Sequence, residues 1–392
     1  MKPDDADRFA EDAAVYVHIP FCSAICPYCD FAVVAGQDEL ADRYTAAVRS
    51  EIERSEPWRP LSAVYFGGGT PSHIDPRLLV SILEALRDHH GIAADCEISL
   101  EANPEDIDVA RARALRSLGF NRVSFGAQSF DAAVLSRLGR RHGPQQIESS
   151  VGAAKSAGFE NLSVDLMFGA VGETNESWQR SIERAVATGV QHISCYALTV
   201  ERGTALGRAV GAGAAAPDPD VQADRYEMAD KLLGSFDFDR YEVSNWSRPG
   251  FECKYNLVVW AQGEYEAYGN GAHGFRDGVR YRNHRRVDAY ISRVESGRSA
   301  RAGEERITGW DAELDRLFVG LRRSAGVSQG PGTEALLASS EGRSLVDVGV
   351  LAVENGRLSV RKPLITDAVH RSVVSLGTGD MHCSTNPSPL SS

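Results

Sequence analysis

Short apolar runs alternate along the first half of the chain with segments in which apolar residues recur every third or fourth position. The short runs are typical of buried strands, and the periodic segments are typical of helices with one buried face. Strands that alternate with helices in this way form β/α units with a parallel sheet. We expect strands at 15–19, 63–66, 97–100, 122–125, 162–167 and 192–198.

The helix expected after the second strand has clear boundary signals. Asp75 is a good N-cap residue, Pro76 suits the first helical turn, and Gly91 is placed to end the helix. Between them, leucine and isoleucine residues recur along one face. The other helices are expected from 38 to 52, through 115–118, at 132–138 and 145–157, and around 178–186.

Six β/α units predict an α/β fold, a partial (β/α)6 version of the TIM barrel that stays open on one side. A Gly-, Ala- and Pro-rich break near 209–219 ends this pattern, and a different pattern of short elements begins near 308. The predicted organisation is a disordered acidic tail, a core barrel, an accessory region that closes one end of the barrel, a small C-terminal domain and a disordered tail. Their expected bounds are 1–13, 14–210, 211–300, 301–376 and 377–392.

The composition narrows the class of protein. Hydrophobic residues make up 43% and charged residues 24% of the 392 residues, as in soluble globular proteins. No apolar run approaches the roughly 18 residues of a membrane helix, and the acidic N-terminus is unlike a signal peptide. The net charge of −12 argues against nucleic acid as a partner. The seven cysteines do not form a disulfide-like pattern, which favours a reducing, cytoplasmic location.

Three cysteines lie close together directly after the first strand. Cys22, Cys26 and Cys29 have C-x3-C-x2-C spacing, so one loop can bring the three thiolates to a single inorganic cluster. Iron–sulfur clusters usually have four cysteine ligands, and three would leave one iron open to another cofactor. Two alternatives are a zinc site completed by His18 or a distant residue, and three buried thiols with no metal.

Polar groups follow the other predicted strands as well. The turn Gly67-Gly68-Gly69-Thr70 follows the second strand, and its glycines allow a ligand to approach the backbone closely. Glu101 ends the third strand, Gln128 follows the fourth, and Asp165 lies in the fifth. Since the carboxyl ends of parallel barrel strands share one rim, we expect these groups to form one site.

The segment His18-Ile19-Pro20-Phe21-Cys22, continued by C26-P-Y-C29-D-F, resembles the radical S-adenosylmethionine (SAM) superfamily. In these proteins SAM occupies the open iron of a [4Fe–4S] cluster. This motif is similar to that of the branch that contains oxygen-independent coproporphyrinogen III oxidase and the heme chaperones called HemW. The oxidase carries a further cysteine two residues after the third, and Phe31 stands there, which favours the HemW side.

This resemblance implies roles for further residues. The glycine turn matches the element that binds the SAM amino group through the backbone. Arg140 matches an arginine of the SAM site, although Arg137 and Arg141 are close in sequence. The resemblance also implies a partial radical SAM barrel and a winged-helix-like C-terminal domain. The implied SAM-site residues are Tyr16, Tyr28, Gly68, Gly69, Thr70, Glu101, Gln128, Arg140 and Asp165.

The heme signature of the branch, H-N-x-x-Y-W, is altered in this chain. Tyr255 stands in place of the histidine and Val259 in place of the tyrosine. Tyrosine can ligate heme iron, and His273 is an alternative ligand. His273 lies in a segment, 269–274, that matches G-x-G-x-x-G, but no βαβ context accompanies it and we do not expect a nucleotide site.

The resulting hypothesis is a HemW-like radical SAM protein that binds a [4Fe–4S] cluster, SAM and heme, and passes heme to client hemoproteins. The main alternative is an oxygen-independent coproporphyrinogen III oxidase, or another oxidoreductase that uses a 5′-deoxyadenosyl radical. A structural zinc protein is the third possibility. The sequence identifies no catalytic residue beyond the cofactor sites.

Overall fold

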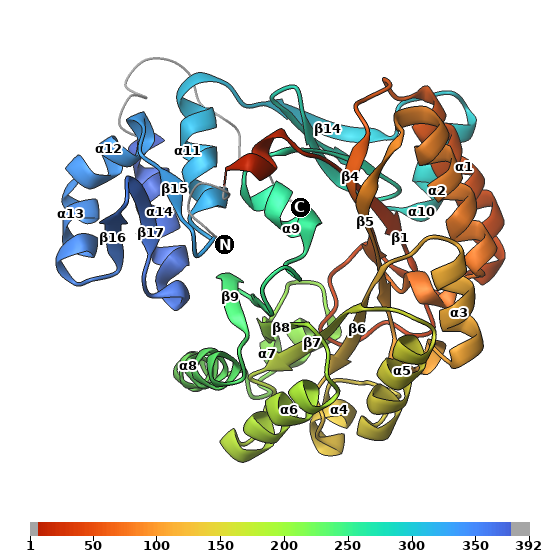
Figure 1. Ribbon diagram of the computed structural model, residues 1–392, viewed down its shortest axis with the longest axis horizontal. Helices are drawn as coiled ribbons and strands as arrows, with labels where there is room; N and C mark the ends of the chain where they lie inside the picture. Colours follow the sequence, from red (N-terminus) through yellow and green to blue (C-terminus); the bar gives the residue numbers. More distant parts are fainter. Residues whose placement is uncertain (1–6, 378–392) are drawn as a thin grey trace.

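The computed structural model describes residues 7–377, so residues 1–6 and the predicted C-terminal tail from 378, with Cys383, lie outside the described residues. A curved sheet of 12 strands dominates the molecule, and its order is β14-β13-β12-β11-β1-β4-β5-β6-β7-β8-β10-β9. Figure 1 shows this sheet as an open arc with helices α1 to α6 along its outer side. The six central strands are β1 (Ala13–Ile19), β4 (Leu61–Gly68), β5 (Ile92–Ala102), β6 (Arg122–Gln128), β7 (Asn161–Phe168) and β8 (His192–Ala197).

The six central strands run parallel and pair in chain order. Their outward side chains, such as Val64, Leu100 and Val164, are fully buried against the helices. The predicted open (β/α)6 barrel is therefore confirmed. The helices on its outer side are α1 (Ala41–Arg54), α2 (Pro76–His90), α3 (Val109–Ser117), α4 (Ala132–Arg137), α5 (Pro144–Ser156) and α6 (Asn175–Ala187).

The boundary signals of α2 act as predicted. The Asp75 side chain accepts a hydrogen bond from the Arg77 amide, Pro76 occupies the first turn, and Gly91 ends the helix with φ 81°. The preceding helix differs slightly from the prediction. Residues Asp38–Leu40 form a 3-10 turn, and the α-helix begins only at Ala41.

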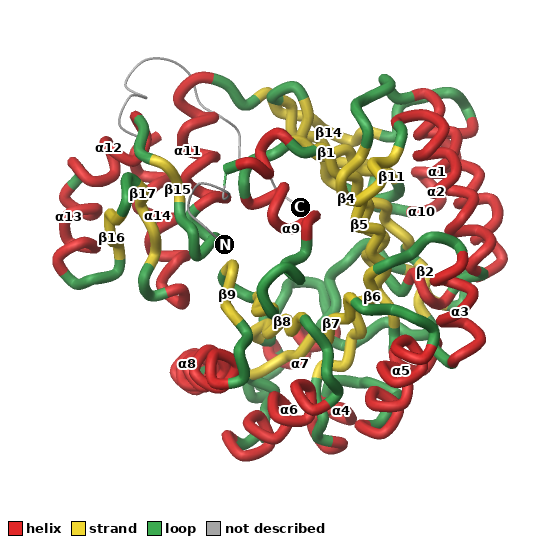
Figure 2. Tube along the Cα trace, viewed as in Figure 1, coloured by secondary structure: helices red, strands yellow, loops and turns green. Residues whose placement is uncertain are grey.

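The accessory region extends the sheet at both of its edges. An open barrel leaves unpaired backbone groups on its first and last strands, and further strands can satisfy them. Strand β11 (Glu264–Tyr268) pairs in parallel with β1, and β10 (Asn245–Ser247) pairs antiparallel with β8. In Figure 2 the strands of the large sheet, in yellow, form an arc with red helices along its outer side. The remaining strands are β9 (Asp239–Glu242), β12 (His273–Arg276), β13 (Val279–Asn283) and β14 (Arg301–Arg306).

Four helices belong to the same region, and α9 lies between the two arms of the arc in Figure 1. Its residues Leu257 and Val258 are buried together with Ala14 of β1 and Ala63 of β4. The helix thus fills part of the barrel near the beginnings of these strands. The four helices are α7 (Ala205–Gly211), α8 (Pro219–Ser235), α9 (Lys254–Trp260) and α10 (Val287–Glu295).

The C-terminal unit has its own hydrophobic core, which includes Leu317, Leu336, Leu358 and Val369. Its order of helix, strand, two helices and two strands is that of a winged helix, as the resemblance implies. Residues 301–306 pair with β13 in the large sheet, so this unit begins after them and not at 301 as predicted. Its elements are α11 (Gly309–Gly320), β15 (Val327–Ser328), α12 (Pro331–Ala338), α13 (Ser340–Asp347), β16 (Leu351–Glu354), β17 (Arg357–Val360) and α14 (Thr366–Gly377).

The end of the predicted N-terminal tail is structured, contrary to expectation. Residues Arg8–Glu11 form a 3-10 helix, and the Phe9 side chain is 4% exposed because it packs in the same hydrophobic cluster as α9. The Asp7 carboxylate forms an ion pair with Arg357, with 2.7 Å between Oδ2 and Nη1. A single apolar residue among charged neighbours gave no periodic signal from which this packing could be predicted.

Candidate functional site

The cysteine loop, residues 20–35, leaves the carboxyl end of β1 and folds back on itself. Strand β2 (Phe21–Cys22) pairs in parallel with β3 (Val34–Ala35), and the Cys29 amide donates to the Cys26 carbonyl over 3.1 Å. Cys22, Cys26 and Cys29 all carry free thiols. Burial, together with the neighbouring Cys29 and Cys26 thiols, raises the pKa of Cys22 to about 11. The loop therefore places three free thiols together, and a bound metal centre would hold them as thiolates.

Two side chains from outside the loop contact these thiols. Thr70, after β4, donates to the Cys22 sulfur over 3.5 Å, and Arg140 donates to the Cys26 sulfur over 3.3 Å. Asn103, after β5, links the two because its amide group donates to Thr70 and accepts from Arg140. Among the neighbouring arginines, Arg140 is thus the one that reaches the cysteine loop, whereas the guanidinium of Arg137 lies near Gly172.

The glycine turn after β4 packs directly on the end of β1. A β-carbon on Gly68 would lie 2.3 Å from the His18 ring, and one on Gly69 would lie 2.7 Å from the Pro20 carbonyl. The Gly69 amide donates to the Ile19 carbonyl over 2.8 Å, so the turn holds the cysteine loop in place. A side chain at either glycine would therefore collide with the chain itself before it could obstruct a ligand.

Two carboxylates lie beside this turn on the inner face of the barrel. Glu101 accepts hydrogen bonds from the Tyr65 hydroxyl over 2.9 Å and from the Gly68 amide over 3.0 Å. Asp165 accepts from the Ser124 hydroxyl at 3.0 Å. Burial, and then the nearby charge of Asp165, raise the pKa of Glu101 to about 7. Glu101 is therefore partly protonated near neutral pH.

Gln128 and Tyr28 complete the set of predicted residues near the cysteine loop. Gln128 has φ 64°, a left-handed conformation that is unfavourable for a residue with a side chain and is often found at functional sites. It lies at an irregularity in the pairing of β6 with β7. The Tyr28 side chain is beside Cys26 and Arg140, and burial raises its pKa.

Arg122 is a prominent residue of the barrel interior that the sequence analysis did not select. Its side chain is 2% exposed, yet Nε and Nη1 have no hydrogen-bond partner among the described residues. Its positive charge acts on both Glu101 and Asp165 and lowers their pKa values against the effect of burial. The signal that could have identified it is a charged residue within an otherwise apolar strand, 122–125.

Tyr255 lies below the carboxylates in a cluster of aromatic rings. Its ring centroid is 5.3 Å from that of Tyr65, 6.0 Å from Tyr16 and 6.1 Å from Tyr265. Burial raises the pKa of Tyr255 well above its usual value, so the phenol is protonated at neutral pH. Helix α9, which carries Tyr255, thus brings it against Tyr16 on the inner face of the barrel.

His273 lies apart from this group, on β12 of the antiparallel extension. Its side chain is exposed and has no hydrogen-bond partner among residues 7–377. Partial burial and the charges of Arg282, Arg280 and Arg285 lower its pKa, so the imidazole is neutral at neutral pH. The two predicted heme-ligand candidates, Tyr255 and His273, therefore have different surroundings.

The zinc alternative finds no support in the surroundings of His18. Its Nδ1 lies 3.2 Å from the Tyr16 hydroxyl and its Nε2 lies 3.0 Å from the Ala32 carbonyl, so both ring nitrogens are occupied. Within the described chain, no three His, Cys, Asp or Glu side chains, the three loop cysteines included, converge on a position for a single metal ion, so this finding does not separate zinc from a cluster.

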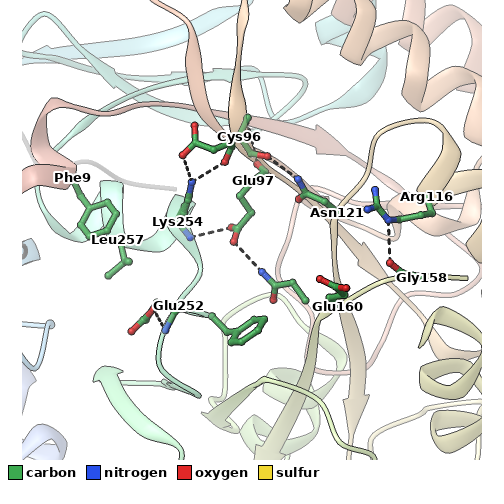
Figure 3. Close-up of a pocket in the computed structure, with 14 residues that line it drawn as sticks. Phe9, Cys96, Glu97, Arg116, Asn121, Gly158, Glu160, Glu252, Lys254 and Leu257 are labelled. Carbon is green, nitrogen blue, oxygen red and sulfur yellow. Dashed lines mark hydrogen bonds and ion pairs between the residues drawn. The ribbon is translucent and has the colours of Figure 1, made fainter. Parts of the chain in front are cut away.

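A hollow with a volume of about 350 Å³ lies at the end of the barrel opposite the cysteine loop. Figure 3 shows Glu97, Lys254 and Asn121 around it. The Glu97 carboxylate accepts from the Lys254 amide over 3.0 Å, and the Lys254 ammonium pairs with Asp95. This hollow lies at the beginnings of β5 to β7, far from the rim where barrel proteins carry their active sites.

Comparison with known proteins places this geometry in a family. The model of the radical SAM superfamily matches residues 16–185. The heme chaperone HemW of Mycobacterium tuberculosis is 38% identical over 379 residues, which cover 92% of this chain and 94% of that protein. HemW of Bacillus subtilis is 34% identical and covers 85% of this chain and 88% of its own length.

The fold is also that of coproporphyrinogen III oxidase (HemN) from Escherichia coli, a radical SAM enzyme. The TM-score is 0.80 over 94% of this chain and 92% of the oxidase, at 22% identity, which shows the fold alone. None of the helices within residues 7–377 is long and apolar enough to cross a membrane. On the strength of the sequence identity along nearly its whole length, the chain belongs to the HemW family of the radical SAM superfamily.

Proposed function

We propose that this chain is a heme chaperone that binds a [4Fe–4S] cluster and SAM, and that delivers heme to client hemoproteins. The observation that carries the proposal is the 38% identity to a heme chaperone along 92% of the chain. Phe31 adds to it, because its side chain is 63% exposed at the position where the oxidase branch has a further cysteine.

Cys22, Cys26 and Cys29 are the residues that would hold the cluster. Three free thiols on one loop, with Thr70 and Arg140 donating hydrogen bonds to two of the sulfurs, suit a group that carries thiolate charge. Hydrogen bonds to cluster sulfurs also tune the reduction potential of iron–sulfur centres. When reduced, such a cluster supplies an electron for the cleavage of SAM.

The half-buried groups around the rim offer suitable partners for SAM. An ammonium group donates hydrogen bonds, so it would bind to carbonyl oxygens of this turn, while the amides of Gly68, Gly69 and Thr70 already donate within the protein. Glu101 and Asp165 can accept hydrogen bonds from ribose hydroxyls. Arg140 is positively charged and suits the carboxylate of SAM. Tyr16, Tyr28 and Gln128 line the same interior.

The second candidate is oxidation of a porphyrinogen, and the similarity of fold to coproporphyrinogen III oxidase motivates it. This reaction requires substrate access to the rim beside the cluster. The exposed Phe31 in place of a cysteine favours the chaperone function over the oxidase.

One experiment separates the two functions. The anaerobically reconstituted protein, with SAM, is offered either ferric heme and an apo-hemoprotein or coproporphyrinogen III. A chaperone will bind heme and transfer it to the apoprotein, measured by the absorbance of the product, without oxidising the porphyrinogen. Porphyrinogen oxidation with no heme binding would contradict the proposal. The free thiols of the cysteine loop would persist in a cytoplasmic, reducing location, where we expect the clients.

A further inference from the structure

Strands β11 to β13 present a group of side chains on one face, which we call the His273 face. It consists of Tyr265, His273, Phe275, Arg280 and Arg282. Cross-strand partners share a face of a sheet, and the registers pair Tyr265 with Phe275, His273 with Arg282, and Phe275 with Arg280. Tyr265 in turn pairs with Ala14 of β1, so this is the face that continues the inner face of the barrel.

His273 is the chemically distinctive member of the face. Its imidazole is exposed and makes no hydrogen bond to any described residue, so both ring nitrogens can serve another partner. Histidine is the commonest protein ligand of heme iron. Tyr255, in contrast, packs its ring against Tyr16, Tyr65 and Tyr265.

Two unpaired positive charges flank His273. Three guanidinium groups, those of Arg280, Arg282 and Arg285, act electrostatically on its imidazole. Arg280 is neutralised by Asp315 at 2.7 Å, whereas Arg282 and Arg285 have no carboxylate partner among the residues that the structure describes. Glu305 lies across from Arg280 on β14 and is the nearest acidic residue in the sheet register. Two guanidinium groups without a carboxylate partner among the described residues, beside an imidazole that makes no hydrogen bond, suit a ligand with two carboxylates and a metal.

Aromatic side chains and the cysteine loop border the same face. The Arg280 guanidinium lies 5.9 Å from the centre of the Phe275 ring. Arg285 donates to the Asp30 carbonyl, and Asp30 directly precedes the exposed Phe31. The face therefore includes one apolar ring, that of Phe275, and lies next to the cysteine loop, which carries the exposed Phe31, without including the cysteines.

We infer that His273 ligates the iron of heme and that Arg282 and Arg285 bind its two propionate groups, with Phe275 and Phe31 against the porphyrin plane. This inference rests on the proposed function, and it assigns the heme site to the antiparallel extension and not to the altered signature at Tyr255. Arginine forms charge-assisted, often bidentate hydrogen bonds with carboxylates, which suits the propionates.

The test is a titration of the full-length protein with ferric heme, followed by absorbance in the Soret region. His273→Ala is expected to weaken binding by at least about tenfold and to shift the absorbance maximum, and added imidazole should restore the spectrum. Arg282→Gln and Arg285→Gln should each weaken binding by about three- to fivefold. Cluster content and circular dichroism of each variant confirm that it is folded.

Matched variants make the titration specific. His284→Ala removes a histidine whose charged neighbour is Arg293, and Arg286→Gln removes an arginine already paired with Asp288; neither should change heme affinity. Wild-type binding in His273→Ala with loss in Tyr255→Phe would overturn this site and leave the chaperone function intact. A wild-type protein that binds no heme would overturn both. If the matched variants weakened heme binding equally, the loss would not be specific to His273, Arg282 and Arg285, and the assignment would be overturned.

Discussion

The cysteine rim and the His273 face lie next to each other and are built in opposite ways. At the rim, the potential ligand groups are already held by the protein: Thr70 contacts Cys22, Arg140 contacts Cys26, and Glu101 accepts two hydrogen bonds. On the His273 face, the imidazole and the Arg282 guanidinium have no such partners within residues 7–377. A site whose side chains are fixed by hydrogen bonds within the protein suits a cofactor that stays bound. A site whose side chains are exposed and make no such bonds suits a ligand that must be released.

The strongest test of the rim replaces a cysteine. Cys26→Ala should lose nearly all cluster iron and sulfide and should not bind SAM, because two thiolates cannot hold the cluster. The matched variant Cys96→Ala removes a thiol that is buried in the core, and it should keep full cluster content. Iron and sulfide analysis after anaerobic reconstitution measures both. Full cluster occupancy in Cys26→Ala would show that the cysteine loop does not bind the cluster.

Gly69→Ala is expected to lower stability, cluster content and SAM affinity together, each by less than the cysteine replacement lowers cluster content. The new β-carbon would approach the Pro20 carbonyl to 2.7 Å, so the glycine turn and the cysteine loop must separate, at a cost of about 1–3 kcal/mol in the free energy of unfolding. Cluster content and SAM affinity should therefore fall together. Gly152→Ala adds a β-carbon with nothing within 4 Å and should change neither. Loss of SAM affinity at full cluster content would show that the turn contacts only the ligand.

The third test uses the raised pKa of Glu101, which lies at about 7. Below that pH the carboxyl is protonated and accepts hydrogen bonds less well, so SAM affinity should fall by up to about tenfold per pH unit below pH 7 and level off above it. Glu101→Gln should bind SAM more weakly and with a flat pH profile. Isothermal titration from pH 6 to 8 measures this, and an unchanged slope in the variant would exclude Glu101 as the titrating group.

Arg122→Met should have the smallest effect of the four on SAM binding, and it tests how the buried charge of Arg122 influences Glu101. Arg122 has no ion-pair partner among residues 7–377, so the replacement removes the cost of burying its charge. It also removes the electrostatic stabilisation of Glu101 and Asp165, and because these two effects oppose each other the free energy of unfolding should change little. Because the Arg122 charge lowers the pKa of Glu101, the pH midpoint for SAM binding should move upward by a fraction of a unit. A downward shift would contradict the electrostatic role.

The rim could be predicted from the sequence because each of its parts is a local signal. The spacing of Cys22, Cys26 and Cys29, the glycine turn and Glu101 each follow a strand that apolar residues mark, and parallel strands bring their ends together. What could not be predicted was how the turn packs, since the contact of Gly69 with Pro20 depends on the register between β1 and β4.

The His273 face depends on contacts that are distant in sequence. Residue 13 pairs with residue 264, and no local pattern specifies which strand will cover the open edge of β1. For that reason His273 could be selected as a candidate ligand, while Arg282 and Arg285 could not be connected with it. The same holds for Phe9, which is buried against α9 although it lies in an acidic segment.

The central claim is that the cluster site and the heme site are separate. The most direct measurement is the dissociation constant of ferric heme for the Cys26→Ala protein, which lacks the cluster, beside that of the reconstituted wild type. We predict that the two constants agree within about threefold, since no cysteine belongs to the His273 face. Loss of heme binding together with the cluster, in a variant whose circular dichroism is unchanged, would contradict the account.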